Sequence, residues 1–514
     1  MDSANRRGEP ASSRRWAILA TIIAFEFVIE LDTSIVNIAL PTLGRQLHAS
    51  TSELQWVVDS YVLVLASLLL FTGTIVDRIG GRPMLIAGAF TFGAASVAAA
   101  IASNVGQLIA MRALMGLGGA LLFPATLFVL SDTFQPDERA RAFSIWSAVA
   151  GLSFALGPTL GGWLVQQFGW SAIFWVNVPI LGAAMLVGLP LVRAARAAHA
   201  RPLDALGAVL AVGGLTSLLY AVIEAPERGW TDGRTLAAFA IASAALAGLA
   251  LWESRSASPM LDSRLLGGGR TAAAATALGL TFMTMAGTLF VLTQYLQFAL
   301  RYSPLQAGVR IMPVALVFAV AATASVAVSR RLGSKMTVAA GLALITASLA
   351  TLSTISDNSG YGLVLSTLVV GGIGLGLAVT PAMEVTLNAL PSGSAGVGSS
   401  VNTTAITLGG ALGVAVIGSV LSSRFSGLLA SGGDSPGTTP KAIAGAFQAA
   451  ARTHDIALTA TVRHALISAS STAFLASAGV AAAGVLLALV FLPQSASPSL
   501  QPVNVDEPLG TPAG

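Results

Sequence analysis

Stretches of about 20 mostly apolar residues recur along almost the whole chain, separated by short segments rich in arginine, glycine and proline. A helix needs about 20 such residues to cross the hydrocarbon core of a bilayer, so each stretch predicts a membrane span. The sequence predicts fourteen spans, at 16–40, 53–72, 84–103, 108–131, 141–165, 171–192, 204–224, 235–252, 271–298, 305–328, 337–356, 362–390, 394–422 and 465–492. An even number of spans places both termini on one side of the membrane.

The first predicted span breaks the apolar pattern, because it carries three acids near its middle. A carboxylate in hydrocarbon costs roughly 2.5–3.5 kcal/mol, so such acids normally face a wet cavity or a partner. On a helix, one narrow polar stripe is formed by Glu26, Glu30, Thr33 and Asn37. We expect this stripe to meet the substrate. Asp32 points about 130° away from it and is expected to face a neighbouring helix.

Two further charges are expected at the level of Asp32. At 1.5 Å per residue, Asp32, Asp59 and Arg112 lie about 13, 10 and 8 Å below the outer ends of their spans. The three side chains could therefore meet in one layer and carry proton coupling, since a carboxylate that changes partner can bind and release a proton. Asp59 could also contact the substrate. Alternatively, the buried acids only hold the helices together by hydrogen bonds.

Composition agrees with an all-α membrane protein. The 514 residues are 54% hydrophobic and 10% charged, whereas soluble domains carry about 25% charged residues. The absence of cysteine excludes disulfides and thiolate metal sites. The four histidines lack metal-ligand spacing, and no Gly-rich phosphate loop is present. We therefore expect no metal, no cofactor, no nucleotide, no nucleic-acid partner and no enzymatic activity.

The distribution of basic residues predicts the orientation. With the N-terminus inside, the inner segments carry 17 Lys and Arg residues and the outer segments carry 8. The positive-inside rule thus predicts a multi-pass plasma-membrane protein with cytoplasmic termini. The expected parts are an inner arm 1–15, a six-helix half 16–192, a linker 193–203, two extra helices 204–252, a linker 253–270, a second half 271–492 with outer loop 423–464, and an inner tail 493–514.

An internal repeat supports two similar halves. The segment 78–82, Arg-Ile-Gly-Gly-Arg, returns at 331–335 as Arg-Leu-Gly-Ser-Lys, and Gly88 matches Gly341 in the same register. The segment 155–157, Ala-Leu-Gly, returns at 411–413. Transporters are commonly built from such repeats, with the substrate site between them. A non-transporting receptor or scaffold, the distant alternative, has no need of a repeat.

Several motifs recur in a recognisable order: residues 31–41 (LDTSIVNIALP), 73–82 (GTIVDRIGGR), Arg112 with Gly116 and Gly119, residues 151–162 of the fifth span, 168–179 and 302–308. Together they resemble the motifs of the major facilitator superfamily, and within it those of the fourteen-span drug:proton antiporters. The resemblance covers nearly the whole chain and implies a major facilitator fold, with two six-helix halves plus two central helices. It also implies efflux driven by proton exchange.

Two motifs suggest gates. Asp77, Arg78 and Arg82 lie at the inner mouth, where an Asp–Arg network and a helix end can close a gate. They could equally serve only as a topology signal and a turn. In span five, Gly157 and Gly161 share one face, so that a neighbouring backbone can approach closely, and Pro158 bends the helix. This combination predicts a hinge or seal, although plain small-residue packing would need the same residues.

The acids favour a cationic substrate. An acid at Asp59 resembles pumps for quaternary ammonium compounds, although the segment 400–404 lacks the carboxylate that such pumps carry there. Glu384 either supplies a second-half acid or only lies at the interface. We predict proton-coupled efflux of lipophilic, cationic drugs or antiseptics, which would confer antibiotic resistance. The expected partners are small-molecule drugs, protons and the lipid bilayer, and the protein is expected to act as a monomer. The alternative is an exporter of one endogenous metabolite or antibiotic.

Overall fold

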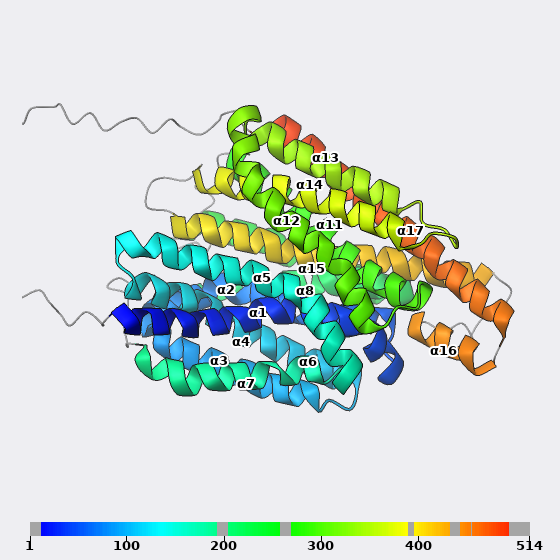
Figure 1. The fold of residues 1–514 in the computed structure, drawn as a ribbon, viewed down its shortest axis with the longest axis horizontal. Helices are drawn as coiled ribbons and strands as arrows, with labels where there is room; N and C mark the ends of the chain where they lie inside the picture. The colour runs from blue at the N-terminus through cyan, green and yellow to red at the C-terminus, as the bar shows by residue number, and fades with distance from the viewer. Residues whose placement is uncertain are drawn as a thin grey trace, which may run out of the picture.

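The computed structural model describes residues 12–192, 204–256, 269–388, 395–431, 443–453 and 455–492. The tail 493–514, the linker 193–203, most of the linker 253–270, the arm up to residue 11 and part of the loop 423–464 lie outside these described residues. The described chain is helical apart from short turns. Its long helices run side by side along the molecule (Figure 1).

The first half contains seven helices. Their bounds are α1 Ser12–Gln46, α2 Thr51–Ile79, α3 Gly81–Ala100, α4 Val105–Thr133, α5 Pro136–Phe168, α6 Ala172–Trp175 and α7 Asn177–Ala183. A π-helical turn, Ala184–Gly188, and a 3-10 turn, Leu189–Leu191, follow α7. The sixth predicted span is thus divided between α6 and α7. The physical reason is Pro179, which has no N–H to donate to the carbonyl of Trp175.

The remaining helices comprise the extra pair and the second half. Their bounds are α8 Ala205–Arg228, α9 Gly233–Arg255, α11 Gly269–Gln294 with a π-helical turn Tyr295–Ala299, α12 Pro304–Leu332, α13 Ser334–Leu352, α14 Tyr361–Asn388, α15 Ala395–Ser431, α16 Ile443–Thr453 and α17 Ile456–Phe491. Within the described residues, thirteen segments are long and apolar enough to cross a membrane. α1, with its three acids, is not among these thirteen, yet it runs beside them along the bundle (Figure 1).

Equivalent helices in the two halves begin and end in the same way. α2 starts with a capping box between Ser50 and Glu53, and α12 starts with one between Ser303 and Gln306. α2 ends at Gly80 with φ 97°, and α12 ends at Gly333 with φ 80°, a conformation that favours glycine. The repeated glycine motif therefore encodes a repeated tight turn, and the predicted two-half architecture is confirmed.

Glycines also bring equivalent helix pairs close together. A Cβ on Gly88 of α3 would lie 2.8 Å from the Leu122 side chain of α4. A Cβ on Gly341 of α13 would lie 2.6 Å from the Gly374 carbonyl oxygen of α14. Such contacts leave no room for a side chain, so the backbones pack directly. The matched register of Gly88 and Gly341 is therefore a packing requirement that occurs in both halves.

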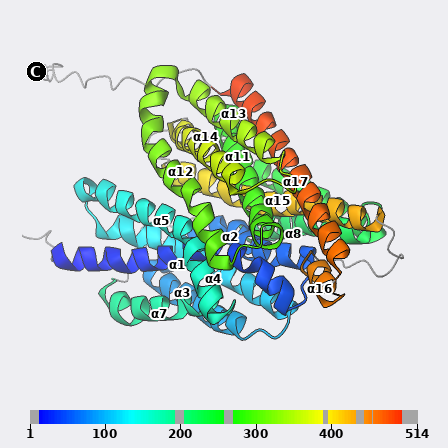
Figure 2. The ribbon, with the colours of Figure 1, turned by 45° about the vertical axis from the view of Figure 1, so that its right-hand side comes forward.

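The two halves meet at one end of the molecule. Figure 2 shows the first half and the second half converging near α16 and separating toward the end where α1 begins and α17 ends. Hydrogen bonds that join the halves gather at the converging end. Gln55 donates to the Val414 carbonyl at 2.9 Å, and Gln297 donates to the Ile38 carbonyl at 2.9 Å. The two halves are therefore held together at the end opposite the start of α1 and the end of α17.

The extra helix α8 contacts both halves at the converging end. The Trp56 indole of α2 donates to Glu224 at 3.3 Å, and the Ser52 hydroxyl donates to Glu227 at 2.9 Å. From the other half, the Ser419 hydroxyl of α15 donates to the α8 backbone at 2.7 Å. α9 packs along α8 and is covered far less by the rest of the bundle. α8 is therefore part of the packed bundle, whereas α9 lies at its edge.

Candidate functional site

A buried ion pair joins the first and fourth helices. The Arg112 guanidinium of α4 donates through Nη1 to Oδ2 of Asp32 on α1, and both side chains are 0% exposed. Arg112 Nε also donates to the Val57 carbonyl of α2 at 2.9 Å. The guanidinium carbon lies 4.4 Å from the centre of the Tyr61 ring. One arginine therefore ties three helices together inside a region with no water-exposed surface.

Asn177 completes this cluster, although no role was predicted for it beyond its place in the motif 168–179. Its side-chain amide donates to Oδ1 of Asp32 and to the Ser96 hydroxyl, both at 3.3 Å. Asn177 is the first residue of α7, directly after the interruption that Pro179 imposes. Asn177 thus places a neutral donor on the carboxylate oxygen that Arg112 does not hold.

The cluster has spare hydrogen-bonding capacity. Within the described residues, Nη2 of Arg112 and Oδ1 of Asn177 have no hydrogen-bond partner, although both are buried. Leaving such groups unpaired costs about 1–3 kcal/mol each, and more for a charged group. These two atoms can therefore take a further partner, for example when Asp32 takes up a proton and its attraction to Arg112 falls.

Asp59 does not join the pair, contrary to the expectation that the three charges meet. It is fully buried on α2, and neither of its carboxylate oxygens accepts a hydrogen bond in the described part of the chain. The reason is helical phase, because Asp59 and Tyr61 point about 160° apart, and Tyr61 faces Arg112. Asp59 instead shares a face with Gln55, one turn away, which contacts α15.

The polar stripe of α1 lies on a different side of that helix from Asp32. Glu26 is buried with both carboxylate oxygens unpaired within the described residues, whereas Glu30 is half-buried. The Thr33 hydroxyl donates to the Ile29 carbonyl of its own helix at 2.9 Å. Asn37 is buried, and its carbonyl oxygen has no partner among the described residues. The stripe therefore offers several acceptors and few internal partners for them.

α5 packs against α1 with one face. With another face it packs against α12 of the second half, across the seam, which is the contact between the two halves. A Cβ on Gly157 would lie 2.9 Å from Ser34 Cβ, and a Cβ on Gly161 would lie 2.8 Å from Ile38 Cγ2. On the seam side, the backbone of Pro158 lies directly against Gly308 of α12. The close approach predicted for these glycines is present, and the proline marks the contact between halves.

The remaining candidate residues lie near the other end of the bundle. Asp77 is half-buried and Arg78 is exposed in the last turn of α2, and Arg82 is half-buried at the start of α3. Glu384 is half-buried one turn before α14 ends. Neither group is part of the Asp32 cluster. No set of three metal-ligating side chains occurs within the residues that the structure describes.

Comparison with known proteins yields one family. The family model "Major Facilitator Superfamily" matches residues 22–414. The tetracenomycin C resistance and export protein of Streptomyces glaucescens is 36% identical over 419 residues, which cover 81% of this chain and 78% of that protein. The multidrug efflux pump LfrA of Mycolicibacterium smegmatis is 31% identical over 492 residues, covering 94% and 95%.

Solved structures support the same architecture. A bacterial homologue of the human lysosomal transporter Spinster, in an inward-facing and unoccupied conformation, superposes with a TM-score of 0.68. The alignment covers 95% of this chain and all of the other, at 14% sequence identity. At that identity the likeness concerns the fold.

Proposed function

Because the chain belongs to the major facilitator superfamily, we propose that it exports lipophilic drugs across the plasma membrane in exchange for protons. Export is supported by relatives that are named for drug resistance and efflux, among them the tetracenomycin C protein and LfrA. The observation that carries proton exchange is the buried pair of Asp32 and Arg112. A single proton on Asp32 removes the charge that holds Arg112 and so changes the contacts among three helices.

The proposed orientation assigns the two ends of the molecule to the two sides of the membrane. With both termini in the cytoplasm, the converging end of the halves faces outward and the separated end faces inward (Figure 2). The helices of the two halves then diverge toward the cytoplasm, the side from which a drug would be taken up. A rocking motion that separates Gln55 from α15 and Gln297 from α1 would open the outer end.

We further propose that Glu30 or Asp59 meets a cationic substrate. A cation that enters a low-dielectric cavity loses hydration worth several kcal/mol, which apolar walls do not restore. An unpaired carboxylate compensates for this loss by charge pairing. Asp59 is buried near the contact between α2 and α15 and has no hydrogen-bond partner in the described chain. A proton that arrives at the same carboxylate cancels the attraction, so that proton binding and drug release are linked.

Purified protein in liposomes tests this function directly. A pH gradient, acidic on the side of the outer end, should drive transport of lipophilic cations and should fail to drive matched anions. Collapse of the gradient with an ionophore should stop transport. If the protein transported only one endogenous metabolite or antibiotic, the alternative function, a specific exporter, would be favoured. The relative named for tetracenomycin C export supports that alternative.

Charge preference has a separate test. The affinity for a monovalent lipophilic dye should rise between roughly pH 5 and pH 8 as cavity carboxylates ionise. Glu30→Gln or Asp59→Asn should flatten this rise, because the ionising group is removed. Flat affinity in the unmodified protein would contradict the cation-binding proposal.

The orientation can be tested with single cysteines, because the chain has none of its own. Thr231→Cys lies exposed in the turn between α8 and α9, and Ser254→Cys lies exposed near the end of α9. An impermeant thiol reagent on intact cells should label the first variant and should label the second only after lysis. The reverse pattern would place the termini outside.

A further inference from the structure

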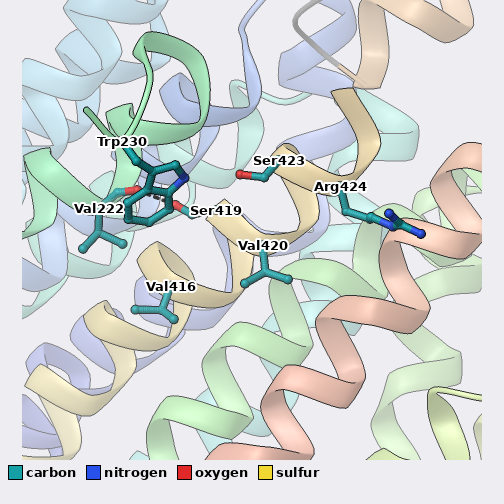
Figure 3. Close-up of a pocket in the computed structure, with 7 residues that line it drawn as sticks. All are labelled: Val222, Trp230, Val416, Ser419, Val420, Ser423 and Arg424. Carbon is teal, nitrogen blue, oxygen red and sulfur yellow. Dashed lines mark hydrogen bonds between the residues drawn. The ribbon is translucent and has the colours of Figure 1, made fainter. Parts of the chain in front are cut away.

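A groove lies between the extra helix α8 and α15 at the converging end of the molecule (Figure 3). Its volume is about 510 Å³, and it is not part of the Asp32 cluster. Val222 of α8 and Val416 and Val420 of α15 form apolar walls, Trp230 covers one side, and Arg424 lies at one end. The groove therefore combines a long apolar surface with a single basic group.

The arrangement follows from helix periodicity. Val416, Val420 and Arg424 are spaced four residues apart, so they form one stripe along α15. The distance along the axis from the first valine to the arginine is about 12 Å at 1.5 Å per residue. Between the two helices, the Ser419 hydroxyl donates to the Val222 carbonyl at 2.7 Å. That hydroxyl is therefore satisfied, and the groove lining presents mostly carbon to an occupant.

The polar end of the groove carries the positive charge of Arg424. Arg424 is exposed and has no ion-pair or hydrogen-bond partner in the described chain, and no acid lines the groove. Trp230 is 53% exposed in the turn between α8 and α9. Tryptophan is enriched where hydrocarbon meets the lipid headgroups. The arginine end of the groove is therefore at the level of the headgroups, and its valine walls are at the level of the acyl chains.

We propose that this groove binds an anionic phospholipid, with the headgroup phosphate on Arg424 and an acyl chain along the valines. A zwitterionic lipid fits less well, because its ammonium group would find no carboxylate. A cationic drug would be repelled by Arg424. The site is independent of the proposed export function. Since α8 and α15 each supply one wall, the lipid would hold the extra helix against the second half.

Lipid binding to the purified full chain tests the proposal. Native mass spectrometry would count phosphatidylglycerol and phosphatidylcholine molecules retained after titration of each lipid. The unmodified protein should retain phosphatidylglycerol preferentially. Arg424→Gln should weaken this retention about fivefold, since a basic group at an anionic membrane surface contributes about 1 kcal/mol. Val420→Phe should weaken it independently, because the ring occupies the groove.

Arg452→Gln provides the matched control, because Arg452 is an exposed arginine on α16, outside the groove. This variant should retain phosphatidylglycerol as the unmodified protein does. The proposal is overturned if Arg424→Gln and Val420→Phe bind phosphatidylglycerol normally. Equal loss in Arg452→Gln, or equal retention of phosphatidylcholine by the unmodified protein, would also overturn it, because either result indicates general charge attraction or simple coating by lipid.

Discussion

The two halves of the molecule share a skeleton but differ in chemistry. Gly157 of α5 lies on Ser34 of α1, and Gly413 of α15 lies on Met283 of α11 in the corresponding way. Two residues before these contacts, α1 carries Asp32, whereas α11 carries Thr281. The hydroxyl of Thr281 donates to its own helix at 2.8 Å, so it needs nothing from a neighbour. The repeat therefore preserves packing and leaves the charge on one side.

The fourth helix of each half shows the same contrast. Gly118 of α4 and Gly374 of α14 occupy equivalent close contacts, with the helices α3 and α13. In that register, Leu368 of α14 takes the place of Arg112. Leu368 is buried, and the pair that joins α1 to α4 has an apolar counterpart in the second half. The first half thus holds the buried ion pair, whereas each half supplies one glutamine donor and one backbone acceptor to the seal.

Removal of one member of the ion pair should have the largest effect on stability. Asp32→Ala leaves Arg112 buried and unpaired, and breaking such a pair costs about 3–5 kcal/mol in the free energy of unfolding. Thr281→Ala, the counterpart in the second half, should cost less than about 1 kcal/mol. Thermal unfolding in detergent measures both.

The double variant Asp32→Ala with Arg112→Met sharpens the comparison. It removes both charges and should recover much of the lost stability, because an apolar replacement of a buried pair is often neutral. Equal losses in Asp32→Ala and Thr281→Ala would contradict the assignment of charge to one half.

Glycine substitutions should affect the two halves alike. A Cβ on Gly157 would lie 2.9 Å from Ser34 Cβ, and one on Gly413 would lie 2.9 Å from Cα of Met283. Gly157→Ala and Gly413→Ala should each cost about 1–3 kcal/mol through overpacking. Gly151→Ala meets nothing within 4 Å and should be neutral or slightly stabilising. If only one of Gly157→Ala and Gly413→Ala were tolerated, the packing of the two halves would not be equivalent.

Within the Asp32 cluster, the smaller effect is expected at Asn177. Asn177→Ala removes the donor to Asp32 and should cost about 1 kcal/mol of stability. Because this donor contacts the carboxylate, the midpoint of the pH profile of transport should also move. Ser96→Ala removes only the far partner of the amide and should leave the midpoint in place. An unchanged midpoint in Asn177→Ala would reduce that residue to a structural role.

The sequence predicts much of this architecture, because apolar length and repeated glycines each have one main structural outcome. The pairing of Asp32 with Arg112 also followed from depth along straight helices. The same use of depth wrongly placed Asp59 with this pair, because depth along a helix does not determine the direction in which a side chain points. Asn177 was missed for the same reason, because its position along span six does not show that its amide faces Asp32.

The central claim is that the charged cluster of the first half couples transport to protons. Asp32→Asn keeps a polar side chain of the same size for Arg112 but cannot exchange a proton in this way. In liposomes with an imposed pH gradient, this variant should lose gradient-driven transport of a lipophilic cation while still binding it, and Thr281→Val in the second half should transport normally. Gradient-driven transport by Asp32→Asn at the rate of the unmodified protein would contradict the account.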